Sequence, residues 1–181
     1  MKRALCHFIY YKLLGWKAHF DLPDGDKYVM CVAPHTSNWD FLLGKLCSRA
    51  QGISVHFLMK KEWFTWPLGY LFKSMGGIPV ERSKNHSLVE KLSEQARQSK
   101  VFHLAITPEG TRSANANWKM GFYYIARGAG IPIVLISIDY KHKCIWADKT
   151  LVPSENVEDD MRTIKQYYSQ FQGKHPRNFA I

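Results

Sequence analysis

The sequence predicts a single α/β domain with a central, mostly parallel β-sheet flanked by helices. Short apolar runs typical of buried strands alternate with amphipathic stretches typical of helices along the chain. The 181 residues, 46% of them hydrophobic, suffice for one well-packed domain and are too few for two ordinary ones, so we treat 1–181 as one unit. Polar loops follow several predicted strands, and such loops gather at the carboxyl edge of a parallel sheet.

The N-terminal stretch 1–17 opens with basic residues and predicts an amphipathic helix. A secretory signal fits poorly, because His7 and Lys12 interrupt the apolar run and no small-residue cleavage site follows. The run is also shorter than the roughly 20 apolar residues that span a membrane. Packing against the core and lying on a membrane surface both remain open. One face can collect apolar side chains: Leu5, Phe8, Ile9, Leu13 and Trp16.

Residues 28–33 (YVMCVA) predict a short buried strand, which Pro34 ends. The next residues are helix-capping types: Thr36, Ser37 and Asn38. Residues five apart on one helix diverge by about 140° at roughly 3.6 residues per turn. His35 and Asp40 can therefore meet only if a helix begins between them, with Asp40 in its first turn. We expect this arrangement.

A histidine oriented by a carboxylate can act as a general base toward a hydroxyl group. The chain has no Gly-x-Ser-x-Gly motif, so we expect the attacking hydroxyl to come from a substrate. The alternative is that His35 and Asp40 make only a structural hydrogen bond.

The segment 55–59 predicts a second strand, and the aromatic run 63–72 follows it. We interpret this run as a helix disturbed by Pro67 that ends near Gly76. Its large apolar side chains suit the core of the domain or the wall of a groove. A short strand at 78–80 comes next.

Residues 86–100 predict an amphipathic helix and 101–106 a further strand. The polar loop 107–113 follows this strand. In this loop Gly110 permits a tight turn or a close backbone approach. The planar guanidinium group of Arg112 can donate two hydrogen bonds to two oxygens of a phosphate.

The rest of the chain continues the alternation. Residues 119–130 predict a helix closed by glycine, and 131–138 a strongly apolar strand. A short strand near 144–147 and an amphipathic helix over 159–171 complete the expected elements.

The net charge indicates which kinds of partner the protein binds, and the cysteines indicate its compartment. The formal net charge of +10 predicts attraction to a polyanion, either nucleic acid, an anionic membrane surface or a phosphorylated substrate. The cysteines lie far apart without a C-x-x-C pair, which favours a reduced, cytosolic setting: Cys6, Cys31, Cys47 and Cys144.

Four ordered motifs resemble those of the glycerolipid acyltransferase family, which includes the lysophosphatidic acid acyltransferases. HTSNWD (35–40) resembles the H-x4-D motif, and GIPVER (77–82) resembles the G-x4-R motif. PEGTR (108–112) and IPIV (131–134) resemble the third and fourth motifs of that family. Together they define a motif-bearing core at 30–138 and imply the family's α/β fold.

The resemblance implies a reaction. His35 would take the proton from an acceptor hydroxyl, and Asp40 would orient the imidazole and stabilise its charge. The resulting alkoxide would attack an acyl thioester of coenzyme A or acyl carrier protein, without a covalent acyl-enzyme. A backbone amide near Gly110 is a candidate donor to the oxyanion. We expect no metal and no tightly bound cofactor, with acyl-CoA or acyl carrier protein as co-substrate.

The resemblance also implies how the acceptor is held. Arg82 and Arg112 would bind its phosphate. The pocket would be shaped by three neighbours in the third motif: Glu109, Gly110 and Thr111. For Glu109, an ion pair that holds an arginine is the alternative.

The expected acceptor is a lysophospholipid, with 1-acylglycerol-3-phosphate first and another lipid, such as a lyso-ornithine-type lipid, as the alternative. We expect a peripheral enzyme on the cytoplasmic face of an anionic membrane. Two rival classes are a nucleic-acid-binding module, for which no recognisable motif occurs, and an inactive lipid-binding member of the family. We expect no nucleic-acid partner.

Overall fold

The computed structural model describes residues 2–80 and 85–181. These residues form a seven-stranded sheet in the order β1-β7-β6-β2-β5-β3-β4. The strands β2 to β6 run parallel to one another, whereas β7 pairs antiparallel with β6. The strands are β1 (Lys17–Phe20), β2 (Lys27–Ala33), β3 (His56–Lys60), β4 (Gly77–Val80), β5 (Phe102–Ile106), β6 (Ile133–Asp139) and β7 (Cys144–Leu151).

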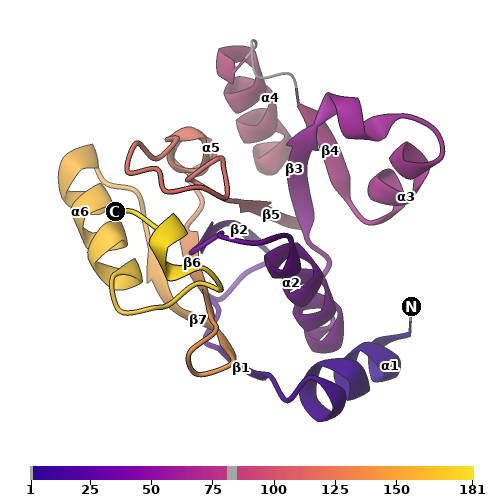
Figure 1. Ribbon diagram of the computed structural model, residues 1–181. Helices are drawn as coiled ribbons and strands as arrows, with labels where there is room; N and C mark the ends of the chain where they lie inside the picture. The colour runs from indigo at the N-terminus through magenta and orange to yellow at the C-terminus, as the bar shows by residue number, and fades with distance from the viewer. Residues whose placement is uncertain (1, 81–84) are drawn as a thin grey trace.

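Helices cover both faces of this sheet, with α5 and α6 on one side and α1 and α2 on the other (Figure 1). The α-helices are α1 (Arg3–His7), α2 (Asn38–Gln51), α3 (Leu68–Ser74), α4 (Asn85–Gln98), α5 (Gly121–Ala129) and α6 (Val157–Tyr168). A π-helical turn, η1 (Phe8–Leu13), continues α1, and short 3₁₀ turns form η2 (Lys61–Phe64) and η4 (Pro176–Asn178). The predicted fold class is confirmed.

Strand β2 shows why two layers of helices are needed. Its side chains alternate between the faces of the sheet, as the period of a strand requires. Val29 and Cys31 pack into the core beneath α4, α5 and α6, while Tyr28 and Met30 pack into the core beneath α2 and η1. A strand buried on both faces reads as a continuous apolar run, and this is the pattern of 28–33.

Helix α2 begins as the sequence predicts. The Ser37 hydroxyl accepts a hydrogen bond from the Trp39 amide, and the Asp40 carboxylate accepts one from the Ser37 amide, which makes a capping box. The helix ends at Gly52, whose φ of 79° is left-handed. The capping box fixes where the polypeptide leaves β2, and so fixes the loop that carries His35.

Three expectations need correction. The strand β1 was not predicted, because its four residues (KAHF) carry only a weak apolar pattern and pair with β7 alone at the sheet edge. The predicted helix over 63–72 begins only at Leu68, after a break that contains Pro67. The helix expected over 1–17 ends at Leu13, and Trp16, expected on its apolar face, follows it, is buried and packs edge-to-face on Tyr140 with 5.0 Å between ring centroids.

No helix among the described residues is long and apolar enough to cross a membrane. The four cysteines are all buried as free thiols.

Candidate active site

His35 and Asp40 meet at the carboxyl end of β2. The imidazole Nδ1 lies 3.2 Å from the Asp40 Oδ2, across the start of α2. The Asp40 side chain is 1% exposed and that of His35 is 16% exposed. The carboxylate is therefore enclosed by protein, while the ring remains accessible to a substrate.

Asp40 accepts further hydrogen bonds that compensate its burial. The backbone amides of Thr36 and Ser37 each donate to Oδ2 at 2.8 Å, and the Tyr140 hydroxyl donates to Oδ1 at 2.7 Å. These donors place N–H or O–H groups on both oxygens of the side chain. Because Asp40 can then only accept, we assign the ring proton of His35 to Nδ1, which leaves Nε2 to accept a proton from a substrate.

Tyr140 is a residue of the site that sequence reasoning missed. It follows β6, 100 residues from Asp40, and its amide donates to the Gln172 carbonyl at 2.8 Å. Burial raises the pKa of its hydroxyl well above the usual value, and the neighbouring Asp40 acts in the same direction, so the hydroxyl remains a donor. The only hint in the sequence was its position just after a strand that lies beside β2.

Glu109 is the second carboxylate of the site. It is 1% exposed, and its Oε1 accepts a hydrogen bond from the His35 amide at 2.8 Å. Its Oε2 finds no hydrogen-bond partner among the described residues. Burial raises the pKa of Glu109 to about 7, the bond from His35 opposes this, and the charge of Asp40 adds to it. Glu109 thus fixes the main chain of His35, while its expected contact with substrate stays a prediction.

The loop after β5 places the other predicted residues. Gly110 has a φ of 66°, the left-handed region that the expected tight turn needs. Its amide donates to the Thr107 carbonyl at 3.2 Å, so this amide is engaged within the turn rather than open to an oxyanion. Thr111 and Arg112 are exposed. Arg82, the other predicted phosphate ligand, lies outside the described residues.

Besides Arg112, a second basic side chain, that of Lys119, lies against this loop. A Cβ atom at Gly110 would lie 2.9 Å from Cε and 3.3 Å from Nζ of Lys119, so the lysine side chain covers the glycine. The Lys119 amide donates to the Pro108 carbonyl at 2.7 Å, which holds the two segments together. Sequence reasoning missed Lys119, since its residue type and position carried no motif.

The C-terminal residues also reach the site. The His175 amide donates to the Thr36 hydroxyl at 3.1 Å, and a Cβ at Gly173 would lie 2.8 Å from that same oxygen. The Lys174 ammonium lies 5.1 Å from the Trp39 ring centroid, within range of a cation–π contact. The segment therefore supports the loop that carries His35, a role that its polar sequence did not indicate.

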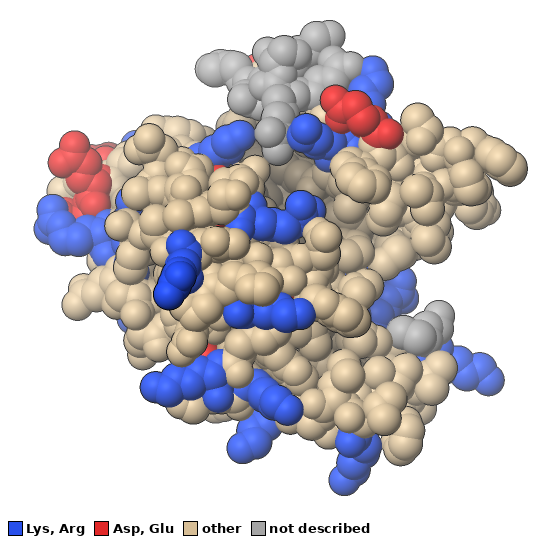
Figure 2. Space-filling model, in the orientation of Figure 1, with Lys and Arg blue, Asp and Glu red and all other residues tan. Residues whose placement is uncertain are grey.

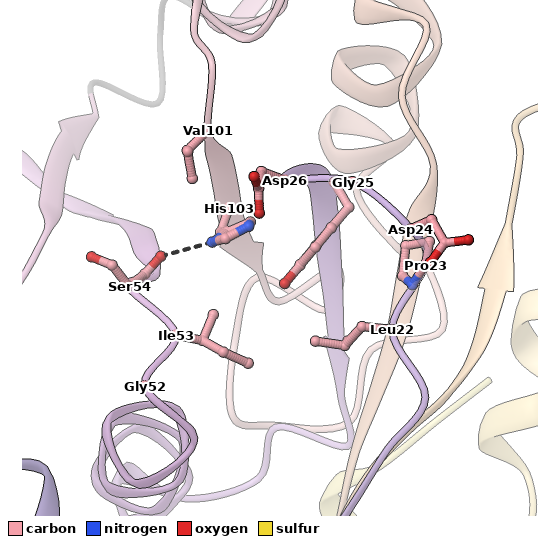
Figure 3. Close-up of a pocket in the computed structure, with 11 residues that line it drawn as sticks. Leu22, Pro23, Asp24, Gly25, Asp26, Gly52, Ile53, Ser54, Val101 and His103 are labelled. Carbon is pink, nitrogen blue, oxygen red and sulfur yellow. Dashed lines mark hydrogen bonds between the residues drawn. The ribbon is translucent and has the colours of Figure 1, made fainter.

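A separate cavity of about 540 Å³ lies at the opposite edge of the sheet, where β2 and β5 begin (Figure 3). The rings of Tyr28 and His103 stack in it, with centroids 4.4 Å apart, and the His103 Nδ1 lies 3.1 Å from the Ser54 carbonyl. It contains none of the predicted site residues. Nowhere in 2–80 or 85–181 do three or more His, Cys, Asp or Glu side chains form a group that could hold a metal ion.

The raised pKa of Glu109 predicts how stability depends on pH. Between its usual pKa of 4.5 and about 7, the folded protein binds more protons at Glu109 than the unfolded chain does. The free energy of unfolding should therefore fall as pH rises through this window. Glu109→Gln removes the effect, and should stabilise the protein at pH 8 by at most about 3 kcal/mol, and little near pH 4.5. Urea unfolding at both pH values measures this.

Glu155→Gln, at an exposed position, is the matched control and should change stability little at either pH. An equal effect of Glu109→Gln at both pH values would show that Glu109 does not titrate in this range.

Comparison with known proteins places this geometry in a family. Residues 19–139 match the family model described as Acyltransferase, a range that contains His35, Asp40 and Glu109 and ends just before Tyr140. The fold is similar to the crystal structure of the 1-acyl-sn-glycerophosphate (LPA) acyltransferase PlsC from Thermotoga maritima. The TM-score is 0.62, with 16% sequence identity and coverage of 93% of this chain and 77% of that chain. A comparison with curated proteins gave no match.

At 16% identity, the structural similarity shows only a shared fold. Membership of the family is shown by the family model. It spans well over half of the sequence and includes the strand, loop and helix that bring His35 to Asp40. The chain therefore belongs to the acyltransferase family.

Proposed function

We propose that the protein transfers a fatty acyl chain from an acyl thioester to the hydroxyl of a lysophospholipid-like acceptor in phospholipid biosynthesis. The observation that carries the proposal is the His35–Asp40 pair, with Nε2 of the imidazole left to accept a proton. Membership of the acyltransferase family and the PlsC-like fold support it. The acyl donor is acyl-CoA or acyl carrier protein, and 1-acylglycerol-3-phosphate is the acceptor that we propose first.

In this proposal the His35 imidazole makes both proton transfers. His35 Nε2 takes the proton of the acceptor hydroxyl while its oxygen attacks the thioester carbonyl carbon. The tetrahedral intermediate then releases the thiolate as the carbon–sulfur bond breaks, and the imidazolium returns the proton to the sulfur. Asp40 stabilises the imidazolium between these steps, and its hydrogen bonds keep the carboxylate in place. No covalent acyl-enzyme forms.

We assign the acceptor's phosphate to the loop after β5. Arg112 and, outside the described residues, Arg82 are the ligands proposed from the sequence. Lys119, which covers Gly110, adds a further cation to this loop. Glu109 and Thr111 complete the pocket in this proposal. A lipid acceptor without this phosphate, such as a lyso-ornithine-type lipid, is the alternative.

We place the protein on the cytoplasmic face of the membrane as a peripheral enzyme. The net charge of +10 favours an anionic surface. The N-terminal helix leaves Leu5, Phe8 and Leu13 about half exposed or more, at 49%, 57% and 71%. These are the side chains that an amphipathic helix would direct into a lipid interface.

Removing the base tests the proposed chemistry. His35→Ala should lose at least about 100-fold in turnover, the lower range for general-base catalysis, with the fold retained by circular dichroism. Asp40→Asn should also lower kcat strongly with little change in the KM for the donor, because it misorients the ring. His103→Ala, in the cavity at the opposite edge, is the matched control and should leave turnover unchanged. Normal turnover in His35→Ala would exclude His35 as the base.

Tyr140→Phe tests the donor to Asp40. Loss of a hydrogen bond to a charged group, worth about 1.5–3 kcal/mol, should lower kcat by roughly ten- to a hundredfold. The KM for the acyl donor should change little, because Tyr140 acts on the orientation of Asp40.

The control for Tyr140→Phe is Tyr167→Phe, because the Tyr167 hydroxyl makes a similar bond to the Asp148 carboxylate at 2.6 Å on the surface of the molecule. If Tyr140→Phe loses only stability and keeps the kcat of the parent, Tyr140 has no role in orienting Asp40.

Arg112→Ala tests whether Arg112 binds the phosphate of the acceptor. Removing a charge-assisted hydrogen bond should weaken acceptor binding, so that the apparent KM for the lysophosphatidic acid acceptor rises roughly ten- to a hundredfold while donor kinetics stay unchanged. Steady-state kinetics with varied acceptor measure this, with the exposed Arg49→Ala at the far end of α2 as control. An unchanged acceptor KM would show that the acceptor lacks a phosphate or binds elsewhere.

A further inference from the structure

We propose that the segment between β3 and β4 carries a bilayer-binding surface, which docks on anionic lipid and turns the carboxyl edge of the sheet toward the membrane. This inference deepens the proposed function, because it names the surface that would present an amphiphilic acceptor to His35. We call it the aromatic surface, and it consists of Trp63, Trp66, Leu68, Tyr70 and Leu71.

The exposure of these side chains is unusual. Trp66 is 92% exposed and Tyr70 82%, while Trp63 and Leu71 are each 52% exposed. Large exposed apolar patches mark interaction sites. Tryptophan and tyrosine combine an apolar body with a polar tip, and for this reason they are enriched at membrane–water interfaces.

The scaffold beneath the aromatic surface is closely packed. Phe64 and Phe72 contact each other on its inner side, with ring centroids 6.3 Å apart. A Cβ at Gly69 would lie only 2.3 Å from the Phe64 carbonyl oxygen, so α3 and η2 can approach only because residue 69 is glycine. The outer rings therefore project from a defined support, in contrast to the two phenylalanines that face inward.

Charge favours a lipid surface as the occupant. Exposed Lys60 and Lys73 lie at the two ends of the segment, and Glu62 is its only acidic residue. In Figure 2 the lobe that contains α3 shows a broad uncharged face, with basic side chains and one acidic group at its margin. Lysine can bury its carbon chain in the interface and keep its ammonium at the headgroups. An uncharged aromatic surface with lysines at its ends matches an anionic bilayer.

Topology places the aromatic surface on the same edge as His35. Strand β3 runs parallel to β2 through β5, so η2 leaves the sheet at the edge where β2 delivers His35. Exposed Trp39, in the first turn of α2, lies at this edge as well. A membrane that contacts the aromatic surface therefore faces the proposed site.

The N-terminal helix reaches the same edge. Strand β1 runs opposite to β2, because it pairs parallel with β7, which is antiparallel to β6. Its amino end, preceded by η1, therefore lies at the carboxyl edge of β2. Trp16 in that connection contacts Tyr140, which binds Asp40. Exposed Leu13 can thus contact the same bilayer as the aromatic surface.

The structure also shows how the two candidate membrane-binding segments, the N-terminal helix and the aromatic surface, can be tested separately. Cys6 and Tyr10 of the N-terminal helix are fully buried, and the Arg3 guanidinium donates to the Ala50 carbonyl at 3.1 Å. Deleting residues 1–17 would therefore damage the core as well as the surface. Substitutions at exposed positions avoid this problem.

The test is sedimentation with vesicles of phosphatidylglycerol and phosphatidylcholine at low salt. The intact chain should pellet with anionic vesicles and less with pure phosphatidylcholine. The double variant W66S/Y70S should bind the anionic vesicles at least about tenfold more weakly, because the apolar area of two aromatic side chains is no longer transferred from water to the bilayer. The control is V101S/V152S, which replaces two exposed apolar residues (55% and 75%) outside the aromatic surface, and should bind as the parent does.

A second measurement does not depend on a disruptive substitution. Brominated lipids should quench the fluorescence of the parent more than that of Trp66→Phe, because the phenylalanine keeps the surface apolar but removes one interfacial indole. Equal binding by W66S/Y70S and the parent, or equal quenching in the parent and Trp66→Phe, would overturn the inference.

Acyl transfer to a short-chain, monomeric acceptor separates this inference from the proposed function. W66S/Y70S should retain the parent's turnover in that assay, and loss of turnover there would place the aromatic surface in the reaction itself, contradicting a docking role. A parent that binds vesicles through Trp66 but transfers no acyl group would leave the inference standing and exclude the proposed function.

Discussion

A carboxylate enclosed by protein needs hydrogen-bond donors for its lone pairs, and the burial of Asp40 imposes this requirement on its surroundings. Two donors come from the amides of the loop that precedes α2, a third is the His35 ring and the fourth is the Tyr140 hydroxyl. The first two form only if the loop turns into a helix at Ser37. The same capping geometry therefore begins α2, satisfies Asp40 and aims the imidazole.

Other parts of the molecule support this arrangement from a distance. Glu109 fixes the His35 main chain from the loop after β5, and the C-terminal segment fixes Thr36 through His175 and the close approach of Gly173. Trp16 packs on Tyr140 from the N-terminal side. The result is that segments from both ends of the chain converge on a loop of a few residues. Such support is what holds a general base in a productive orientation.

The sequence predicted correctly the features that depend on interactions between residues close together in the chain. Pro34 after an apolar run, followed by Ser37, predicted the strand, the break and the helix start, and these gave the contact between His35 and Asp40. Tyr140 could not be found in this way, because its bond to Asp40 depends on the order of strands in the sheet. Residues 107–112 predicted the turn at Gly110 but not the hydrogen bond that the His35 amide donates to Glu109, which requires β5 to lie beside β2. The packing of Gly173 against Thr36 likewise arises only in the folded molecule.

The orientation of the His35 ring is the central feature of this site, and nitrogen-detected NMR of the imidazole tests it most directly. The geometry predicts a proton on Nδ1 that is donated to Asp40, seen as a strongly downfield proton resonance that Asp40→Asn shifts. It also predicts an unprotonated Nε2 in the same spectrum. A proton found on Nε2, or an Nδ1 resonance that is unaffected by Asp40→Asn, would contradict the assignment of His35 as a base oriented by Asp40.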